Sequence, residues 1–99
     1  MAKKLESAEL DAALTGLPGW ELRAGKLVRT WQFADFAEAF AFMTACALRI
    51  HALDHHPEWS NVYATVRTEL VTHDAQGITA KDIELASVME GIAARFQSA

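Results

Sequence analysis

Two adjacent histidines mark the stretch of the chain that is richest in side chains able to transfer protons. His55 and His56 lie between Asp54 and Pro57, and His73 opens the next loop. An imidazole can both give and accept a proton near neutral pH because its ordinary pKa is about 6.5. If the fold returns His73 to the neighbourhood of His55, the two rings form an acid–base pair. We therefore predict that His55 and His73 face one cavity.

A metal site is the alternative interpretation of the same histidines. His51 and His55 are one helical turn apart, which is the spacing of two ligands on one helix face, and His73 would supply a third ligand. The one cysteine, Cys46, lies among apolar residues, where a buried and inert thiol is expected. Glu58 has no obvious reach to such a site. We therefore predict no bound metal.

A carboxylate at the start of the last predicted helix is a candidate partner for these imidazoles. Thr79 and Asp82 have the spacing of a capping box, in which the acid stands at the third helical position. One interpretation is that Asp82 is only a helix cap. The other is that Asp82, which follows His73 after a short loop, also orients an imidazole and fixes its tautomer.

Apolar periodicity around these residues predicts alternating helices and strands. The predicted elements, in order, are a helix over residues 8–14, strands over 20–24 and 27–33, a helix opening at 35, strands over 59–62 and 66–72, and a helix opening at 79. Ser7 is the predicted cap of the first helix and Asp35 that of the second. Pro57 restricts His56 to extended geometry, so the second helix should end near His55.

Short connections between the strands predict an antiparallel sheet. A tight turn at Gly25-Lys26 joins the first two strands, and a turn near Tyr63-Ala64 joins the last two. The predicted fold class is α+β, two-layer, with a four-stranded antiparallel sheet, helices on one face, and the order α-β-β-α-β-β-α. Residues 1–99 make a single domain, because 99 residues is the size of one. A second copy of the chain is expected to cover a sheet edge or an apolar face.

Three further predictions concern side chains outside the candidate site. The central helix should press one apolar face on the sheet, and its phenylalanines are expected in the core; the set is Phe36, Phe40, Phe42, Met43, Ala47 and Ile50. Arg29 lies on an apolar strand face and needs a partner that the sequence does not name. Gly77 is available for a positive φ in the loop before the last helix.

Composition excludes several classes of function. Thirteen acidic against nine basic residues give a net charge of −4, and no basic stripe or glycine-rich phosphate loop is present, so we predict no direct nucleic-acid partner. No run of about 18 apolar residues is present and the N-terminus lacks a signal-peptide pattern, so we predict no membrane span. A single cysteine predicts a reducing, cytoplasmic location.

Three runs of sequence resemble the pterin-4a-carbinolamine dehydratases, also known as dimerisation cofactors of a homeodomain transcription factor. The runs are LVRTWQFADFAEAFAFM at 27–43, DHHPEWSNVY at 54–63 and THDAQGITAKDIELA at 72–86. The resemblance extends from about residue 20 to the last helix. It implies the α+β fold given above and assembly as a homodimer or homotetramer.

The resemblance also implies an activity. Members dehydrate 4a-hydroxytetrahydropterin to quinonoid dihydropterin and so recycle the cofactor of aromatic amino acid hydroxylases. The pterin is the substrate, and no metal, nucleotide or redox cofactor is required. The alternative is a non-enzymatic dimerisation or assembly module on the same fold. Relatives without catalysis are expected to lose the histidines, which this chain keeps, so we favour the enzyme.

Position by position, the resemblance implies the site residues. The implied catalytic residues are His55, His56, His73 and Asp82, and the implied substrate-binding residues are His56, Pro57, Trp59 and Thr72. We expect His55 and His73 to divide the proton transfers, with His56 orienting the pterin and Asp82 supporting the site. Which imidazole acts as acid and which as base stays open.

Overall fold

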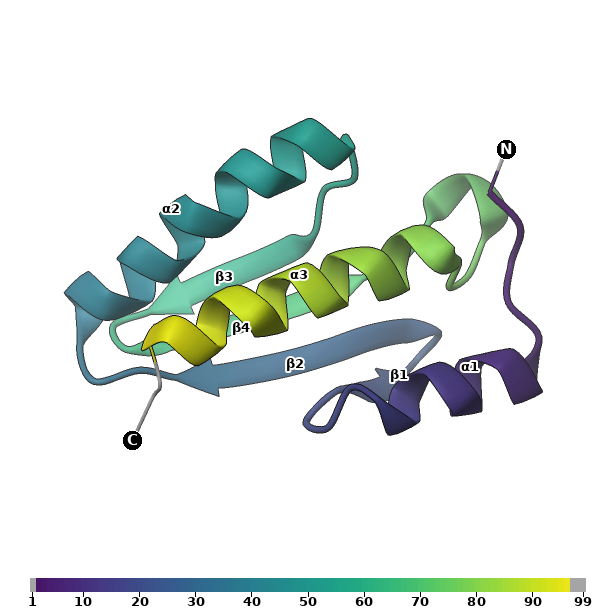
Figure 1. Ribbon diagram of the computed structural model, residues 1–99, viewed down its shortest axis with the longest axis horizontal. Helices are drawn as coiled ribbons and strands as arrows, with labels where there is room; N and C mark the ends of the chain where they lie inside the picture. The colour runs from purple at the N-terminus through teal and green to yellow at the C-terminus, as the bar shows by residue number, and fades with distance from the viewer. Residues whose placement is uncertain (1, 97–99) are drawn as a thin grey trace.

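The computed structural model describes residues 2–96 as a sheet with helices on one side (Figure 1). The elements are α1 (Ser7–Thr15), β1 (Glu21–Arg23), β2 (Lys26–Gln32), α2 (Phe36–Leu53), β3 (Glu58–Val62), β4 (Thr65–Leu70), the short 3-10 turn η1 (His73–Ala75) and α3 (Ala80–Phe96). The predicted α+β class and element order are confirmed. Residue 1 and residues 97–99, the ends of the predicted domain, lie outside the described residues.

The sheet has the strand order β1-β2-β4-β3, and every neighbouring pair is antiparallel. The β1–β2 turn falls at Ala24-Gly25, one residue earlier than predicted, because both residues adopt positive φ values of 49° and 79°. Such a turn matches the twist of the two strands it joins. Tyr63 and Ala64 form the β3–β4 turn, where the sequence predicted it.

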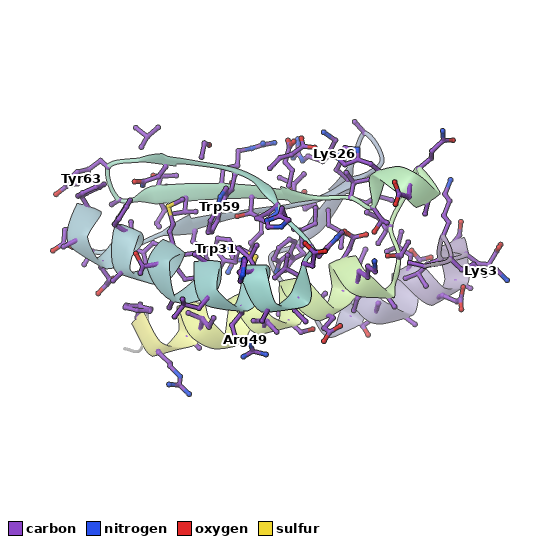
Figure 2. All side chains as sticks on the ribbon, turned by 90° about the horizontal axis from the view of Figure 1, so that it is seen from above. Lys3, Lys26, Trp31, Arg49, Trp59 and Tyr63 are labelled. Carbon is purple, nitrogen blue, oxygen red and sulfur yellow. The ribbon has the colours of Figure 1, made fainter. Side chains whose placement is uncertain are left out.

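The core lies between the sheet and the two long helices. Figure 2 shows the two layers edge-on, with Trp31 between them. The ring of Trp31 lies 4.8 Å from Phe42 of α2 and 5.6 Å from Trp20, measured between centroids. Leu27 and Leu70, which are paired across β2 and β4, are fully buried beneath the helices. This burial of apolar surface supplies most of the driving force for folding.

The face of α2 that meets the core differs from the predicted one. The buried residues are Ala39, Phe42, Cys46 and Ile50. Phe36 is 48% exposed and Phe40 is 54% exposed, so the prediction that both lie in the core was wrong. The helix is apolar on nearly all sides, and spacing alone therefore could not select the buried stripe.

The same composition explains another property of α2. Its 18 residues and mean hydropathy of 1.3 meet the length and composition criteria for a membrane-spanning helix, which the core helices of many globular domains also meet. In this fold one side of the helix packs on α3 and the sheet. Burial also raises the pKa of the Cys46 thiol to about 12, so this thiol stays protonated and inert.

The first residues of α1 and α2 are set by side chains that cap the helix N-terminus. The Asp35 side chain accepts from the backbone N–H of Glu38 at 2.8 Å, which confirms the predicted cap of α2. The cap of α1 is Glu6, whose own N–H donates to the Glu9 carboxylate at 2.8 Å. Ser7 is therefore the first helical residue, and its prediction as the cap was wrong.

Arg29 has the partner that its position on β2 requires. Its Nε donates to Glu90 of α3 at 2.6 Å, and its guanidinium carbon lies 5.0 Å from the centroid of the Trp31 ring. Trp20 donates to the same Glu90 oxygen at 2.8 Å. These contacts connect α3 to the sheet and do not involve the histidines. We therefore assign a structural role to Arg29 and Glu90.

Candidate active site

The predicted histidines meet at one end of the molecule, where α2 ends and η1 and α3 begin (Figure 1). α2 ends at Leu53, two residues before the predicted position, because Asp54 adopts the left-handed conformation with φ 52° and ψ 44°. Its N–H donates to the carbonyl oxygen of His51 at 3.1 Å. The chain therefore leaves the helix before His55, whose ring contacts Asp82 near the start of α3.

A cleft of about 360 Å³ opens at this end. Its lining residues are Asp54, His55, His56, Val71, Thr72, His73, Asp74 and Lys81. His55 and His73 thus share a cleft, although the two strands β3 and β4 separate them along the chain. The volume is within the range of roughly 300–1,000 Å³ that small-molecule sites occupy.

Asp82 is fully buried beside this cleft and anchors His55. Its Oδ1 lies 2.6 Å from His55 Nε2. Its Oδ2 accepts from the backbone N–H of Thr79 at 2.9 Å and from the Thr72 hydroxyl at 2.8 Å. A buried carboxylate requires such partners because desolvation otherwise disfavours its charge.

The two threonines form a directed chain of hydrogen bonds toward this carboxylate. Thr72 gives its only hydroxyl proton to Asp82, so the 2.7 Å contact between the hydroxyls requires Thr79 to donate to Thr72. The Thr79 hydroxyl in turn accepts from the backbone N–H of Lys81 at 3.2 Å. The helix start and the carboxylate therefore hold one another in place. Asp82 is both a cap and a partner of an imidazole.

The contact with Asp82 sets the tautomer of His55. An ionised carboxylate only accepts hydrogen bonds, so the proton of a neutral His55 ring lies on Nε2. The lone pair then lies on Nδ1. The His55 side chain is 12% exposed, so its orientation is set largely by its surroundings.

The partner of His73 is a different carboxylate. The sequence left open which imidazole Asp82 would orient, and the structure shows Asp82 in contact with His55. Glu58, at the start of β3, lies 3.2 Å from His73 Nε2 through its Oε2. Glu58 had no obvious reach to the histidines of the metal alternative, yet it contacts one of them, His73. A contact across strand ends is not visible in the spacing of residues along the chain.

Glu58 is in turn held by a lysine on the outer face of the sheet, away from the helices (Figure 2). Lys26 Nζ donates to Glu58 Oε1 at 2.7 Å and lies 3.6 Å from Glu69. The hydrogen bond from Lys26 lowers the pKa of Glu58 below its ordinary value, with a smaller contribution from His73. Glu58 thus remains ionised at neutral pH.

The other predicted site residues have varied positions. His56 lines the cleft, is 64% exposed and lies 3.4 Å from Asp54. Pro57 and Trp59 do not line it, and Trp59 packs against the core from β3. Thr72 lines the cleft, but its hydroxyl donates a hydrogen bond to Asp82.

Two features near the cleft were not predicted from the sequence: the position of Lys81, and which residue of the loop between η1 and α3 has a positive φ. Lys81 lines the cleft beside Asp82 and was overlooked because a lysine in a first helical turn carries no distinctive signal. In the loop before α3 the positive φ belongs to Gln76 rather than to Gly77. A Cβ at Gly77 would lie 2.7 Å from the Lys4 side chain, so this glycine permits close approach of the N-terminal segment.

Within residues 2–96, no three histidine, cysteine or acidic side chains are grouped as ligands of one metal ion. His51 of the metal alternative is exposed on α2 and does not line the cleft. The carboxylates that contact His55 and His73 are Asp82 and Glu58, respectively. Two imidazoles, each with its own carboxylate, form an arrangement suited to proton transfer.

A solved structure shares the overall fold of this chain. It is named as a transcriptional coactivator/pterin dehydratase from Brucella melitensis and superimposes with a TM-score of 0.89. It is 41% identical in sequence, and the match covers 92% of this chain and 99% of that one.

Relatives of similar length extend the likeness. A protein of Afipia carboxidovorans is 58% identical over 98 residues, which cover 97% of this chain and 98% of the relative. One from Rhodopseudomonas palustris is 52% identical over 98 residues, 97% of each chain. Both carry the provisional name pterin-4-alpha-carbinolamine dehydratase. The family model described as pterin 4 alpha carbinolamine dehydratase matches residues 3–92. The match to the family model and the identity to these relatives show that the chain belongs to the pterin-4a-carbinolamine dehydratase family.

Proposed function

We propose that this protein dehydrates 4a-hydroxytetrahydropterin to quinonoid dihydropterin, with His55 and His73 dividing the proton transfers. The shared cleft carries the proposal, because both rings line it and each has a carboxylate partner. Family membership supports the pterin as the substrate class. In a cell this activity would serve to recycle the cofactor of aromatic amino acid hydroxylases, in a reducing cytoplasm where Cys46 remains a thiol.

The reaction breaks the bond between C4a and its hydroxyl oxygen and removes the proton on N5. A protonated imidazole donates to the departing hydroxyl, which leaves as water, and a neutral imidazole accepts the N5 proton. The electron pair left on N5 forms the C4a=N5 double bond. These steps balance without a redox partner, and the two rings end with exchanged protonation states that solvent restores. Positioned acid–base groups of this kind contribute about 10²–10⁴-fold each.

The surrounding residues have supporting roles in this proposal. Asp82 is a positioning residue that fixes the His55 tautomer and stabilises the ring when it is protonated. His56, exposed at the cleft, orients the pterin. Thr72 forms part of the cleft wall, and the predicted contacts of Pro57 and Trp59 with substrate would require the pterin to extend beyond the cleft lining toward β3.

The direct test is a rapid-mixing assay in which freshly generated 4a-carbinolamine is followed with and without the protein. We expect the protein to accelerate dehydration well above the spontaneous rate. His51→Gln is a matched control, because His51 is an exposed histidine of α2 outside the cleft. It should retain the wild-type rate. A wild-type protein that leaves the spontaneous rate unchanged would refute the proposal.

We also propose that the exposed apolar face of α2 is covered by a second copy of the chain. Phe36, Phe40 and Leu48 are 48%, 54% and 72% exposed on this helix. Apolar patches of this kind in soluble proteins mark interaction surfaces. Sedimentation velocity should show a dimer or tetramer for the wild type and smaller species for Leu48→Glu. A monomeric wild type would contradict this part of the proposal.

A second candidate function is a non-enzymatic module that binds a protein partner. It is favoured by one observation, the coactivator role in the name of the Brucella melitensis protein. The same rapid-mixing assay separates the candidates, because a pure binding module gives no acceleration while it remains folded.

A further inference from the structure

The carboxylate of Glu58 divides its two oxygens between a lysine and a histidine of the candidate site. Its Oε1 accepts from Lys26 Nζ at 2.7 Å, while its Oε2 lies 3.2 Å from His73 Nε2. Glu58 does not line the cleft itself. It contacts the cleft lining through His73.

Fold stability alone is a poor explanation for an acid at this position. Glu58 and Glu69 are directly opposite on β3 and β4, where like charges destabilise a sheet. Lys26 lies close to both carboxylates, at 2.7 Å and 3.6 Å, and offsets their repulsion. Exposed ion pairs add little to the free energy of folding. What distinguishes Glu58 from Glu69 is the contact of its second oxygen with His73.

The backbone around His73 is already held by hydrogen bonds. The Gln76 N–H donates to the His73 carbonyl at 3.0 Å, and the Thr72 N–H donates to Gly77 at 3.0 Å. The rotation of the ring is not held by these bonds, and the His73 side chain is 76% exposed. Among residues 2–96, Glu58 is the polar partner that the ring contacts. Glu58 is therefore the group that can select one ring orientation.

We propose that Glu58 is a positioning residue that holds the His73 ring at the cleft, and that Lys26 keeps Glu58 in the conformation that does so. The contact through Nε2 leaves Nδ1 of His73 available to a ligand. This inference rests on the proposed function, because it assigns a purpose to the orientation of His73 in proton transfer.

Charge gives the proposal a distinctive signature. Glu58 favours the protonated form of His73, whereas Lys26, on the far side of Glu58, disfavours it. The lowered pKa of Glu58 keeps its carboxylate ionised over the whole range in which a histidine titrates. The other charged or titratable residues that line the cleft with His73 are the same in wild type and in every variant tested: Asp54, His55, His56, Asp74 and Lys81.

The test is an NMR titration of the His73 ring in Glu58→Gln and Lys26→Met. The matched control is Glu69→Gln, which removes the same charge from the same sheet face without touching His73. Removing Glu58 should move the His73 titration midpoint to lower pH by a few tenths of a pH unit, the size expected of an exposed pair. Lys26→Met removes a positive charge but also frees Glu58 to leave His73, so the two effects oppose one another and the midpoint should move less than in Glu58→Gln. The control should move it less than half as far as Glu58→Gln.

Dehydratase kinetics provide the second readout. Glu58→Gln should lower kcat by up to about tenfold, since misplacing a catalytic group is costly, with a smaller change in KM. Its pH–rate profile should shift in the same direction as the titration. An unchanged His73 titration, or a shifted titration with unchanged kcat, would overturn the proposal. If the titrations shift as expected but the wild type has no dehydratase activity, the proposed function fails while the pairing of Glu58 with His73 stands.

Discussion

His55 and His73 line the same cleft but are held in different ways. The partner of His55 is Asp82, a fully buried carboxylate that also accepts from Thr79 and Thr72. The partner of His73 is an acid on the rim of the sheet whose side chain is 45% exposed. One imidazole is thus supported from inside the fold and the other from its surface.

This difference separates two tasks in the proposed proton-transfer site. A buried carboxylate held by three donors cannot reorient without leaving polar groups unpaired, so it fixes the geometry of His55. An exposed carboxylate contributes little energy and is screened by salt, so it adjusts His73 without determining the fold. We expect substitutions on the two sides to differ in size and in their response to solvent.

The largest effect is expected from Asp82→Asn. The amide cannot accept from all the donors that surround Asp82, and it permits the wrong tautomer of His55. We expect dehydratase kcat to fall by about 10²-fold or more and stability to fall by about 1–3 kcal/mol from the unpaired buried groups. Enzyme assays and urea unfolding measure the two losses. Asp74→Asn, an exposed acid at the same cleft, should remain close to wild type in both; equal losses would erase the distinction between buried and exposed support.

A smaller loss is expected from Thr72→Val, which removes one donor to Asp82 and one partner of Thr79. Stability should fall by about 1–2 kcal/mol, because a buried acceptor loses a hydrogen bond. Activity should fall less than in Asp82→Asn, since Thr79 N–H still holds the carboxylate. Thermal unfolding with the activity assay would show this order, and a larger activity loss than in Asp82→Asn would contradict it.

Salt should act on one half of the site only. Exposed charges are screened in about 1 M salt, where the Debye length is about 3 Å. The kcat difference between wild type and Glu58→Gln should therefore shrink as NaCl is raised. The difference between wild type and Asp82→Asn should persist. Parallel activity series at low and high salt test this contrast, and equal salt responses would argue against it.

The smallest effect concerns stability in acid. The pKa of Glu58 is lowered from its ordinary 4.5, chiefly by the hydrogen bond from Lys26. A lowered pKa in the folded state means that the contribution is present above the unfolded value and is lost as pH falls through the folded one. Wild type should therefore lose slightly more stability than Glu58→Gln below pH 4.5. Urea midpoints at acidic and neutral pH measure the difference, and a steeper acid loss in the variant would reverse the assignment.

Local signals in the sequence predicted much of this architecture. The acid at 35 and the Thr79/Asp82 pair marked helix starts that the structure confirms. Alternating strands and turn residues predicted the two hairpins to within a few residues. Capping and hairpin turns are settled by neighbours in sequence, so the sequence carries enough information to find them.

The failures came where distant residues decide the outcome. The alanine-rich α2 offers several apolar stripes, and the sheet selects the one with Phe42 rather than the one with Phe36 and Phe40. The pairing of Asp82 with His55 and of Glu58 with His73 depends on how the strand ends meet the helix ends. Spacing along the chain identified the imidazoles and Asp82, but neither which imidazole Asp82 contacts nor the pairing of Glu58 with His73.

The account depends on His55 and His73 acting on one bound pterin. The most direct measurement is dehydration of freshly generated 4a-carbinolamine by His55→Ala, His73→Ala and the double variant, with folding checked by circular dichroism. Each single substitution should lower kcat by about 10²-fold or more, and the double variant should lose less than the product of the two losses, because the groups act on one transition state. Near-normal turnover in both single variants would contradict the account.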